Sequence, residues 1–135
     1  MNEDAIRALA SSCVAEKEQA LFYRALAALA EEHEIDDLSQ RFHDLHADEQ
    51  HHLSRLTARL FEIGHRPPDL AGTSALAVTL EGWEGSARER ELAEVERYAA
   101  IAELDLDPPT RALIEEILSV ERMHAEQLGG KWTPA

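Results

Sequence analysis

The fold is decided by the stretch from residue 36 to residue 64, which reads DDLSQRFHDLHADEQHHLSRLTARLFEIG. Apolar side chains recur in it at alternating spacings of three and four residues, the period of one face of an α-helix. That face carries, in order, Leu38, Phe42, Leu45, Glu49, His52, Leu56, Arg59 and Ile63, with Leu60 beside Arg59. The stretch therefore predicts an amphipathic helix whose apolar face is interrupted near its middle by Glu-x-x-His.

Three further predicted helices carry polar interruptions of the same kind. Periodicity and helix-end signals place them at residues 4–32, 86–104 and 108–128, the last with Asp107 as its cap and ending at Gly129-Gly130. No stretch alternates with the two-residue period of a strand, so we expect an all-α four-helix bundle, one domain over residues 1–135. The inward faces read Ile6, Leu9, Cys13, Glu16, Ala20, Tyr23, Ala27 and Ala30; then Ala87, Glu91, Glu94, Tyr98 and Ile101; then Thr110, Ile114, Ile117, Glu121, His124 and Leu128.

The two halves of the chain repeat one design. YRALAAL at residues 23–29 matches YAAIAEL at residues 98–104, and a glutamate lies seven residues before each tyrosine. Each of these glutamates is followed one helix later by a Glu-x-x-His. We therefore predict two αα-hairpins that donate equivalent residues: Glu16, Tyr23, Glu49 and His52 from the first, and Glu91, Tyr98, Glu121 and His124 from the second.

Other candidate residues have simpler interpretations. A third Glu-x-x-His, Glu62 and His65, is an internal control, because it straddles Gly64 and runs into Pro67-Pro68 at a helix end. Further expectations are surface positions for His43 and His46, solvent-facing positions for Asp48 and His51, a buried structural thiol at Cys13, and packing of Trp83 and Trp132 at the crossover or at a subunit contact.

Composition excludes several classes of function. The net charge of −14 leaves no basic patch for nucleic acid, and although it suits attraction of cations, it also serves solubility alone. The single cysteine, Cys13, excludes an internal disulfide and a rubredoxin-type iron site. We expect a cytoplasmic protein without a membrane segment, because the start lacks a secretory signal and no apolar run approaches the roughly 20 residues of a span.

The connection between the hairpins restricts the topology. A helix over residues 36–64 is about 43 Å long at 1.5 Å per residue, whereas residues 65–72 span at most about 28 Å. If the hairpins are related by a twofold axis, the second and third helices are parallel and the chain must return. Either residues 65–85 form a crossover with a short helix in it, or the hairpins are exchanged between two subunits.

The repeated residues favour a dinuclear metal site. A glutamate and a histidine three residues apart on a helix point to the same side. Two such pairs and two further glutamates give four carboxylates and two imidazoles, whose charge two divalent ions neutralise. Mixed oxygen and nitrogen ligands suit iron or manganese.

This pattern resembles the ferritin-like di-iron carboxylate proteins, specifically the rubrerythrin/erythrin and bacterioferritin branch, over essentially the whole chain. The resemblance implies that Glu49 and Glu121 bridge two iron ions, with Glu16 and His52, and Glu91 and His124, as terminal ligands. It further implies that Tyr23 and Tyr98 donate hydrogen bonds to ligand carboxylates, and that Glu94 is an additional ligand.

The chain also departs from the family pattern. Gln50 stands where bacterioferritins have a haem-binding methionine, so no haem is expected. We expect no fifth helix after residue 128, which puts a storage cage in doubt, and no rubredoxin module. Electrons are therefore expected from another protein or from ferrous iron itself.

The resemblance implies a di-iron oxidoreductase that reacts ferrous iron with hydrogen peroxide or dioxygen, as a peroxidase or ferroxidase. Iron storage or delivery without haem is the alternative, and a manganese protein or a non-catalytic bundle stays open. The expected partners are the small oxidant, an electron donor and a second copy of the chain in a homodimer, with or without swapped hairpins.

Overall fold

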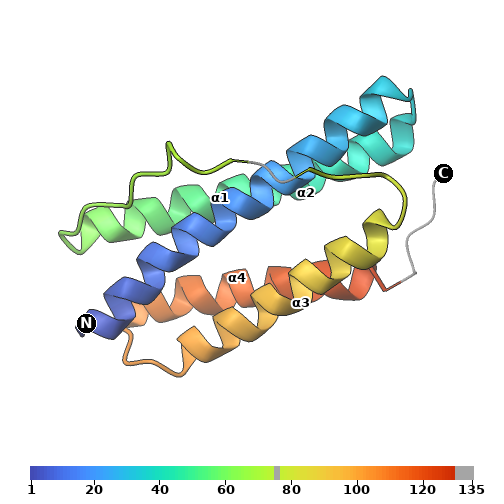
Figure 1. Ribbon diagram of the computed structural model, residues 1–135. Coiled ribbons are helices and arrows are strands. Elements are labelled where there is room, and N and C mark those ends of the chain that lie inside the picture. The colour runs from blue at the N-terminus through green and yellow to red at the C-terminus, as the bar shows by residue number, and fades with distance from the viewer. Residues whose placement is uncertain (75–76, 130–135) are drawn as a thin grey trace.

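The computed structural model describes residues 1–74 and 77–129, and these form four α-helices and no strand (Figure 1). α1 spans Glu3–Glu32, α2 Asp36–Glu62, α3 Trp83–Ala102 and α4 Pro108–Gln127. The expected all-α four-helix bundle is confirmed. Within the described ranges, no helix combines the length and the apolar character that crossing a membrane requires.

The start of α4 is fixed by its own cap and by α2. Asp107 Oδ1 accepts a hydrogen bond from the backbone N–H of Thr110 at 2.9 Å, and Pro108 occupies the first helical position, where no N–H is needed. Arg59 of α2 donates to Asp107 Oδ2 and to Thr110 Oγ1, both at 2.9 Å. These bonds hold the end of α2 against the start of α4.

The helices pair as two hairpins. α1 packs most closely against α2, and α3 against α4. In Figure 1, α1 and α4 run in one direction and α2 and α3 in the other. The contacts agree, since His65, just after α2, lies beside Ile6 near the start of α1. At the opposite end, the Trp83 ring that begins α3 packs edge-on against Phe42, with ring centroids 4.7 Å apart.

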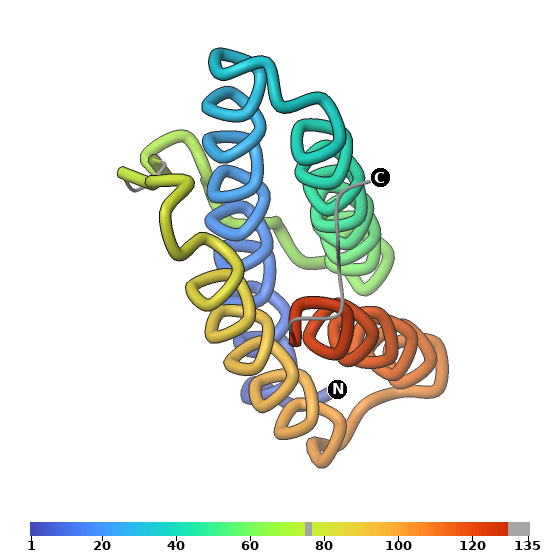
Figure 2. The backbone as a smooth tube through the Cα atoms, turned by 90° about the vertical axis from the view of Figure 1, so that its right-hand side faces the viewer, coloured from blue at the N-terminus to red at the C-terminus, as the bar shows by residue number. Residues whose placement is uncertain are grey.

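The connector between α2 and α3 returns along α1 (Figure 1), and in the view of Figure 2 it crosses behind α1. Its described residues contain turns, a bend and irregular backbone, so the short helix that one of the two alternatives placed within residues 65–85 is not found among them. Pro67 and Pro68 lack the N–H groups that a helix needs. α3 begins at Trp83 rather than residue 86, because packing of Trp83 on Phe42 stabilises its first turn despite Gly85.

Two apolar clusters fill the bundle, one toward each end. The first includes Leu9, Cys13 and Leu56, which confirms a buried Cys13. The second includes Tyr23, Leu26 and Phe42. A polar layer separates them at the middle of the four helices. α4 ends at Gln127 with Leu128 as its cap, in agreement with the helix predicted for residues 108–128, whereas Gly130 and the packing of Trp132 lie outside the described residues.

Candidate metal centre

Six ionisable side chains make up the polar layer. They come from all four helices: Glu16 from α1, Glu49 and His52 from α2, Glu91 from α3, and Glu121 and His124 from α4. The four carboxylates are 0% exposed, and His52 and His124 are 4% and 1% exposed. Burial of an ionised group without a counter-charge costs several kcal/mol. The layer therefore needs cations or protons.

His52 faces three of the carboxylates through one ring nitrogen. Its Nδ1 lies 3.7 Å from Glu16 Oε2 and 3.8 Å from Glu49 Oε1. The same nitrogen lies 3.5 Å from Glu121 Oε1, on the facing hairpin. Carboxylates from α1, from α2 itself and from α4 therefore surround this nitrogen.

His124 has the equivalent surroundings in the other half. Its Nδ1 lies 3.5 Å from Glu91 Oε1 and 3.6 Å from Glu49 Oε1. It also lies 3.5 Å from Glu121 Oε1. Glu49 and Glu121 thus approach both imidazoles with the same oxygen atom, whereas Glu16 and Glu91 each approach one.

These separations fit atoms that share a metal ion. Ligand atoms of Glu49, Glu91, Glu121 and His124 all lie within 4.8 Å of one another, and so do those of Glu16, Glu49 and His52. Two ligand atoms that are each about 2.1 Å from an ion lie roughly 3.0–3.6 Å apart at angles of 90–120°. The contacts to the two histidines are close to this range and too long for good hydrogen bonds.

The chemistry of the donor atoms also fits a metal. Eight oxygen and nitrogen atoms of the layer are buried and have no hydrogen-bond partner among the described residues. They are Glu16 Oε2, both carboxylate oxygens of Glu49 and of Glu121, Glu91 Oε2, His52 Nδ1 and His124 Nδ1. Buried polar atoms are normally satisfied, and such a concentration of unpartnered atoms in one layer points to cations as the missing partners.

Two tyrosines hold the remaining carboxylate oxygens. Tyr23 Oη donates to Glu91 Oε1 at 2.6 Å, and Tyr98 Oη donates to Glu16 Oε1 at 2.6 Å. Each tyrosine therefore donates its hydrogen bond to the glutamate of the other hairpin. Burial raises the pKa of both hydroxyls well above their usual range, and the adjacent carboxylates raise it further, so both remain neutral donors.

Two glutamates of the layer favour their protonated forms in the polypeptide alone. Burial raises the pKa of Glu49 well above its usual range, and the other buried carboxylates add to the effect. Burial also raises the pKa of Glu121 to about 8. Protons therefore offset part of the negative charge when no metal does so.

His124 and Glu91, in contrast, favour their charged forms in the polypeptide alone. Burial opposes a charge on His124, but Asp48, Glu121 and Glu91 outweigh it and raise the pKa to about 11. Burial would raise the pKa of Glu91, but its contacts with His124 and Tyr23 together outweigh burial and lower it. In the polypeptide alone, a protonated imidazole thus occupies the place where a cation would bind.

Asp48 is a residue whose position the sequence did not reveal. It was expected to face solvent, and its side chain is 48% exposed, yet its Oδ2 lies 2.8 Å from His124 Nε2. It reaches α4 because it lies one residue before Glu49 on the flank of the inward face. An acidic residue beside the inward-facing glutamate is the signal that could have identified it.

Gln19 is the other unexpected contact. Its Nε2 donates to Glu91 Oε1 at 3.2 Å, and Arg90 Nε donates to Gln19 Oε1 at 2.8 Å. Gln19 lies three residues after Glu16, as Glu94 lies three after Glu91. The repeat therefore places Gln19 and Glu94 at equivalent positions, and this comparison could have identified Gln19.

Glu94 lies at the edge of the layer. One of its oxygens is within 4.8 Å of ligand atoms of Glu16 and Glu121. Its Oε2, however, lies 2.6 Å from Arg97 Nη2, one turn further along α3. Burial raises the pKa of Glu94, and Arg97 partly offsets that effect. Glu94 is near enough to join the layer but is paired with a cation.

The remaining histidines lie outside the layer. His51 and His65 are exposed, and so is Glu62, so the third Glu-x-x-His does not join the centre. His43 is exposed and pairs with Glu31, and His46 is only partly buried. The sequence interpretation of these residues as surface residues agrees with their positions.

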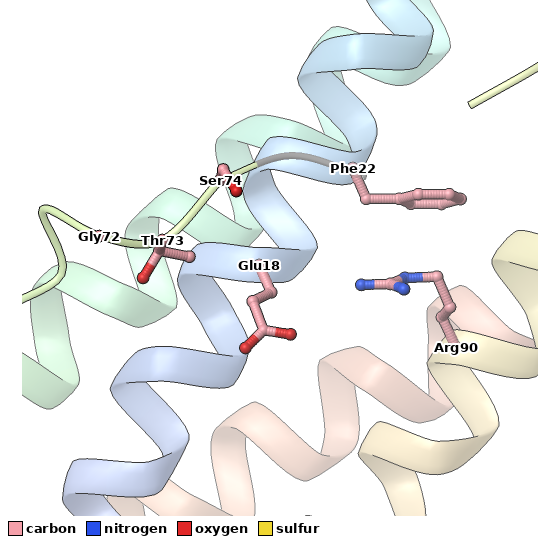
Figure 3. A pocket seen from close by; sticks show the side chains of 6 residues that line it. All are labelled: Glu18, Phe22, Gly72, Thr73, Ser74 and Arg90. Carbon is pink, nitrogen blue, oxygen red and sulfur yellow. The ribbon is translucent and has the colours of Figure 1, made fainter. Parts of the chain in front are cut away.

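A surface pocket of about 360 Å³ lies beside the layer, between α1, the connector and α3 (Figure 3). Glu18 extends into it from α1 and Arg90 from α3, and the Arg90 guanidinium lies 4.5 Å from the centre of the Phe22 ring. Through Gln19, Arg90 connects this pocket to the buried Glu91 by two hydrogen bonds. Gly72, Thr73 and Ser74 complete its lining.

No protein-family model matches the chain, and no curated protein matches it significantly.

Proposed function

We propose that the chain is a di-iron oxidoreductase, with two iron ions bound in the polar layer. One observation carries this proposal: six buried side chains from four helices direct eight unpartnered oxygen and nitrogen atoms into a single layer. Four carboxylates carry a charge of −4 and neutral imidazoles add none, so two divalent ions make the layer neutral. Surface acidic residues would show no such burial.

The donor types support iron, with manganese as the other metal of matching preference. The layer offers carboxylate oxygens and imidazole nitrogens and no thiolate, and this mixture suits iron and manganese better than soft metals. Cys13 is buried, but it belongs to no group of ligand atoms among the described residues. Burial raises the pKa of this thiol, which keeps it protonated.

The distances support different roles for the glutamates. Glu49 and Glu121 would bridge the ions, because each approaches both imidazoles. Glu16 with His52 and Glu91 with His124 would be the terminal ligands. The tyrosine hydroxyls orient the two terminal carboxylates and leave their other oxygens for the metal.

The chemistry follows from this arrangement. Bound ferrous ions would supply two electrons, which with two protons reduce hydrogen peroxide to two water molecules, and dioxygen is the alternative oxidant. The chain's own part is to hold the carboxylates in place and to exclude bulk water, since apolar clusters cover the layer on both sides. An external donor or further ferrous iron would restore the electrons.

We propose that the fold is of the ferritin-like type, with two αα-hairpins joined by a crossover. The close pairing of α1 with α2 and of α3 with α4 supports it. So do the common direction of α2 and α3 and the return of the connector along α1 (Figure 1). One chain contributes all six residues of the layer, so the centre needs no exchange of hairpins between subunits.

The test is anaerobic loading with ferrous iron, followed by addition of peroxide or dioxygen. We expect two irons per chain and a ferric-carboxylate absorbance that rises after the oxidant is added. Glu49→Ala with His124→Ala should abolish both. The matched control, Glu62→Ala with His65→Ala, removes a Glu-x-x-His outside the layer and should change neither. Absence of an absorbance change in wild-type protein that holds two irons would refute the oxidoreductase.

A further inference from the structure

His124 has a hydrogen bond on the side of its ring away from the layer. Its Nε2 lies 2.8 Å from Asp48 Oδ2, so a carboxylate of α2 holds an imidazole of α4. Asp48 accepts the hydrogen from Nε2, which leaves Nδ1 directed at the layer with a free lone pair once the ring is neutral. A carboxylate in this position fixes both the tautomer and the orientation of a metal-binding histidine.

His52 has no such partner. The carboxylates in close contact with its ring among the described residues belong to Glu16, Glu49 and Glu121, and all three face Nδ1. The repeat explains the difference. Asp48 comes directly before Glu49, and the equivalent residue before Glu121 is Val120, which has no hydrogen-bonding side chain.

The two terminal glutamates, Glu91 and Glu16, also differ in the number of hydrogen bonds that they accept. Glu91 Oε1 accepts from Tyr23 at 2.6 Å and from Gln19 at 3.2 Å. Glu16 Oε1 accepts from Tyr98 at 2.6 Å, and the residue equivalent to Gln19 is Glu94, an acceptor that pairs with Arg97. The half of the layer with Glu91 and His124 is therefore held by more hydrogen bonds than the half with Glu16 and His52.

We propose that Asp48 is a positioning residue that makes the Glu91–His124 half the tighter of two unequal metal positions, so that the ions bind in sequence. The inference rests on the proposed dinuclear centre. A preorganised ligand loses less freedom when it binds, and loss of a carboxylate behind a metal-bound histidine costs about 10–100-fold in metal affinity.

The test uses cobalt(II) as a redox-stable probe on the full-length chain after chelation. Visible absorbance in competition with a chelator gives the first and second binding constants separately. In wild-type protein we expect two cobalt ions per chain, the first bound more tightly. Asp48→Ala should weaken the first step by about 10–100-fold and bring the two constants together. Asp48→Asn retains an acceptor oxygen and should restore part of the difference.

Two histidine variants identify the tighter position independently. His52→Ala should keep the tight step, and His124→Ala should lose it. Asp44→Ala is the matched control, because Asp44 is an exposed aspartate of α2 whose hydrogen bond among the described residues comes from Gln40 on the same helix. It should leave both constants unchanged, and far-UV circular dichroism checks the fold of each variant.

The outcomes separate this inference from the proposed function. Binding of fewer than two cobalt ions to wild-type protein would overturn the dinuclear centre itself. Two ions with equal constants, or an unchanged ratio of constants in Asp48→Ala, would overturn only the role of Asp48. The role of Asp48 would also be overturned if His124→Ala kept the tighter cobalt-binding step and His52→Ala lost it.

Discussion

Arg97 Nη2 lies 2.6 Å from Glu94 Oε2, so the glutamate expected as an additional ligand is paired with a cation of its own helix. Arg97 is also anchored to α1, because its Nη1 donates to Ser12 Oγ at 2.9 Å. Because it is paired with Arg97, Glu94 should have a different role from Glu91, which lies one turn earlier and is fully buried.

This pairing predicts different metal contents for two variants. Glu94→Ala should keep two irons per chain, and Glu91→Ala should lose at least one, as measured by elemental analysis after anaerobic loading and desalting. Loss of an iron from Glu94→Ala would show that Glu94 leaves Arg97 and binds the metal.

The tyrosine hydrogen bonds predict an order of stability. Tyr98→Phe leaves Glu16 Oε1 buried without its donor, and such a loss costs about 1–3 kcal/mol. Tyr23→Phe should cost less, because Glu91 Oε1 keeps the hydrogen bond from Gln19. Urea unfolding of chelated protein measures both values. Equal losses, or a larger loss for Tyr23→Phe, would contradict the prediction.

Substitution of Glu49 by glutamine should have opposite effects on stability and on metal binding. Burial raises the pKa of Glu49, so the carboxyl favours its protonated form when no metal is bound, and glutamine imitates that form. Glu49→Gln should raise the free energy of unfolding of chelated protein by about 0.5–2 kcal/mol and should weaken metal binding. Unchanged metal binding would show that Glu49 is not a ligand.

The free energy of unfolding of chelated protein should fall as pH rises from about 6.5 to about 8. In this window the folded state holds protons on Glu121, whose pKa is raised to about 8, and on His124, whose pKa is raised to about 11. The unfolded state has already released them, so the unfolding free energy decreases by about 1.4 kcal/mol per pH unit for each proton.

Above pH 8 Glu121 should cease to contribute, whereas His124 still holds its proton, so the slope should become shallower. Urea unfolding across the range measures both slopes. Metal binding should tighten over the same range, because the ions displace these protons. A free energy of unfolding that rises with pH would contradict the assignment.

Metal should stabilise the fold, since the centre does not exist in the unfolded chain. At a free metal concentration of 100 times Kd, binding adds about 2.7 kcal/mol per site. Thermal unfolding with and without chelator measures this as a difference in Tm. The control Glu62→Ala with His65→Ala should show the wild-type difference, and equal Tm values for wild-type protein would contradict a metal site.

The sequence predicted the helices and the six buried residues because both depend on periodicity. Glu49 and His52 stand in places where the pattern requires apolar residues, and only burial fits those positions. The repeat then identified Glu16 and Glu91 among many acidic neighbours. Whether metal binds is a question that periodicity does not answer.

Contacts between residues at the edge of the pattern could not be predicted in this way. Asp48 lies beside the inward face, and its contact with His124 depends on how closely α2 approaches α4. The first turn of α3 depends on the packing of Trp83 against Phe42, which outweighs the helix-breaking tendency of Gly85. Such contacts are set by the distance between helices.

The crossed hydrogen bonds of the tyrosines have a consequence for the origin of the chain. Tyr23 completes the environment of Glu91, and Tyr98 completes that of Glu16, so neither hairpin contains a whole half of the centre. A homodimer of one ancestral hairpin would pair its residues in this reciprocal way. Duplication and fusion of its gene would carry the subunit interface into a single polypeptide, where later substitutions, such as Val120 at the position equivalent to Asp48, would make the two halves unlike.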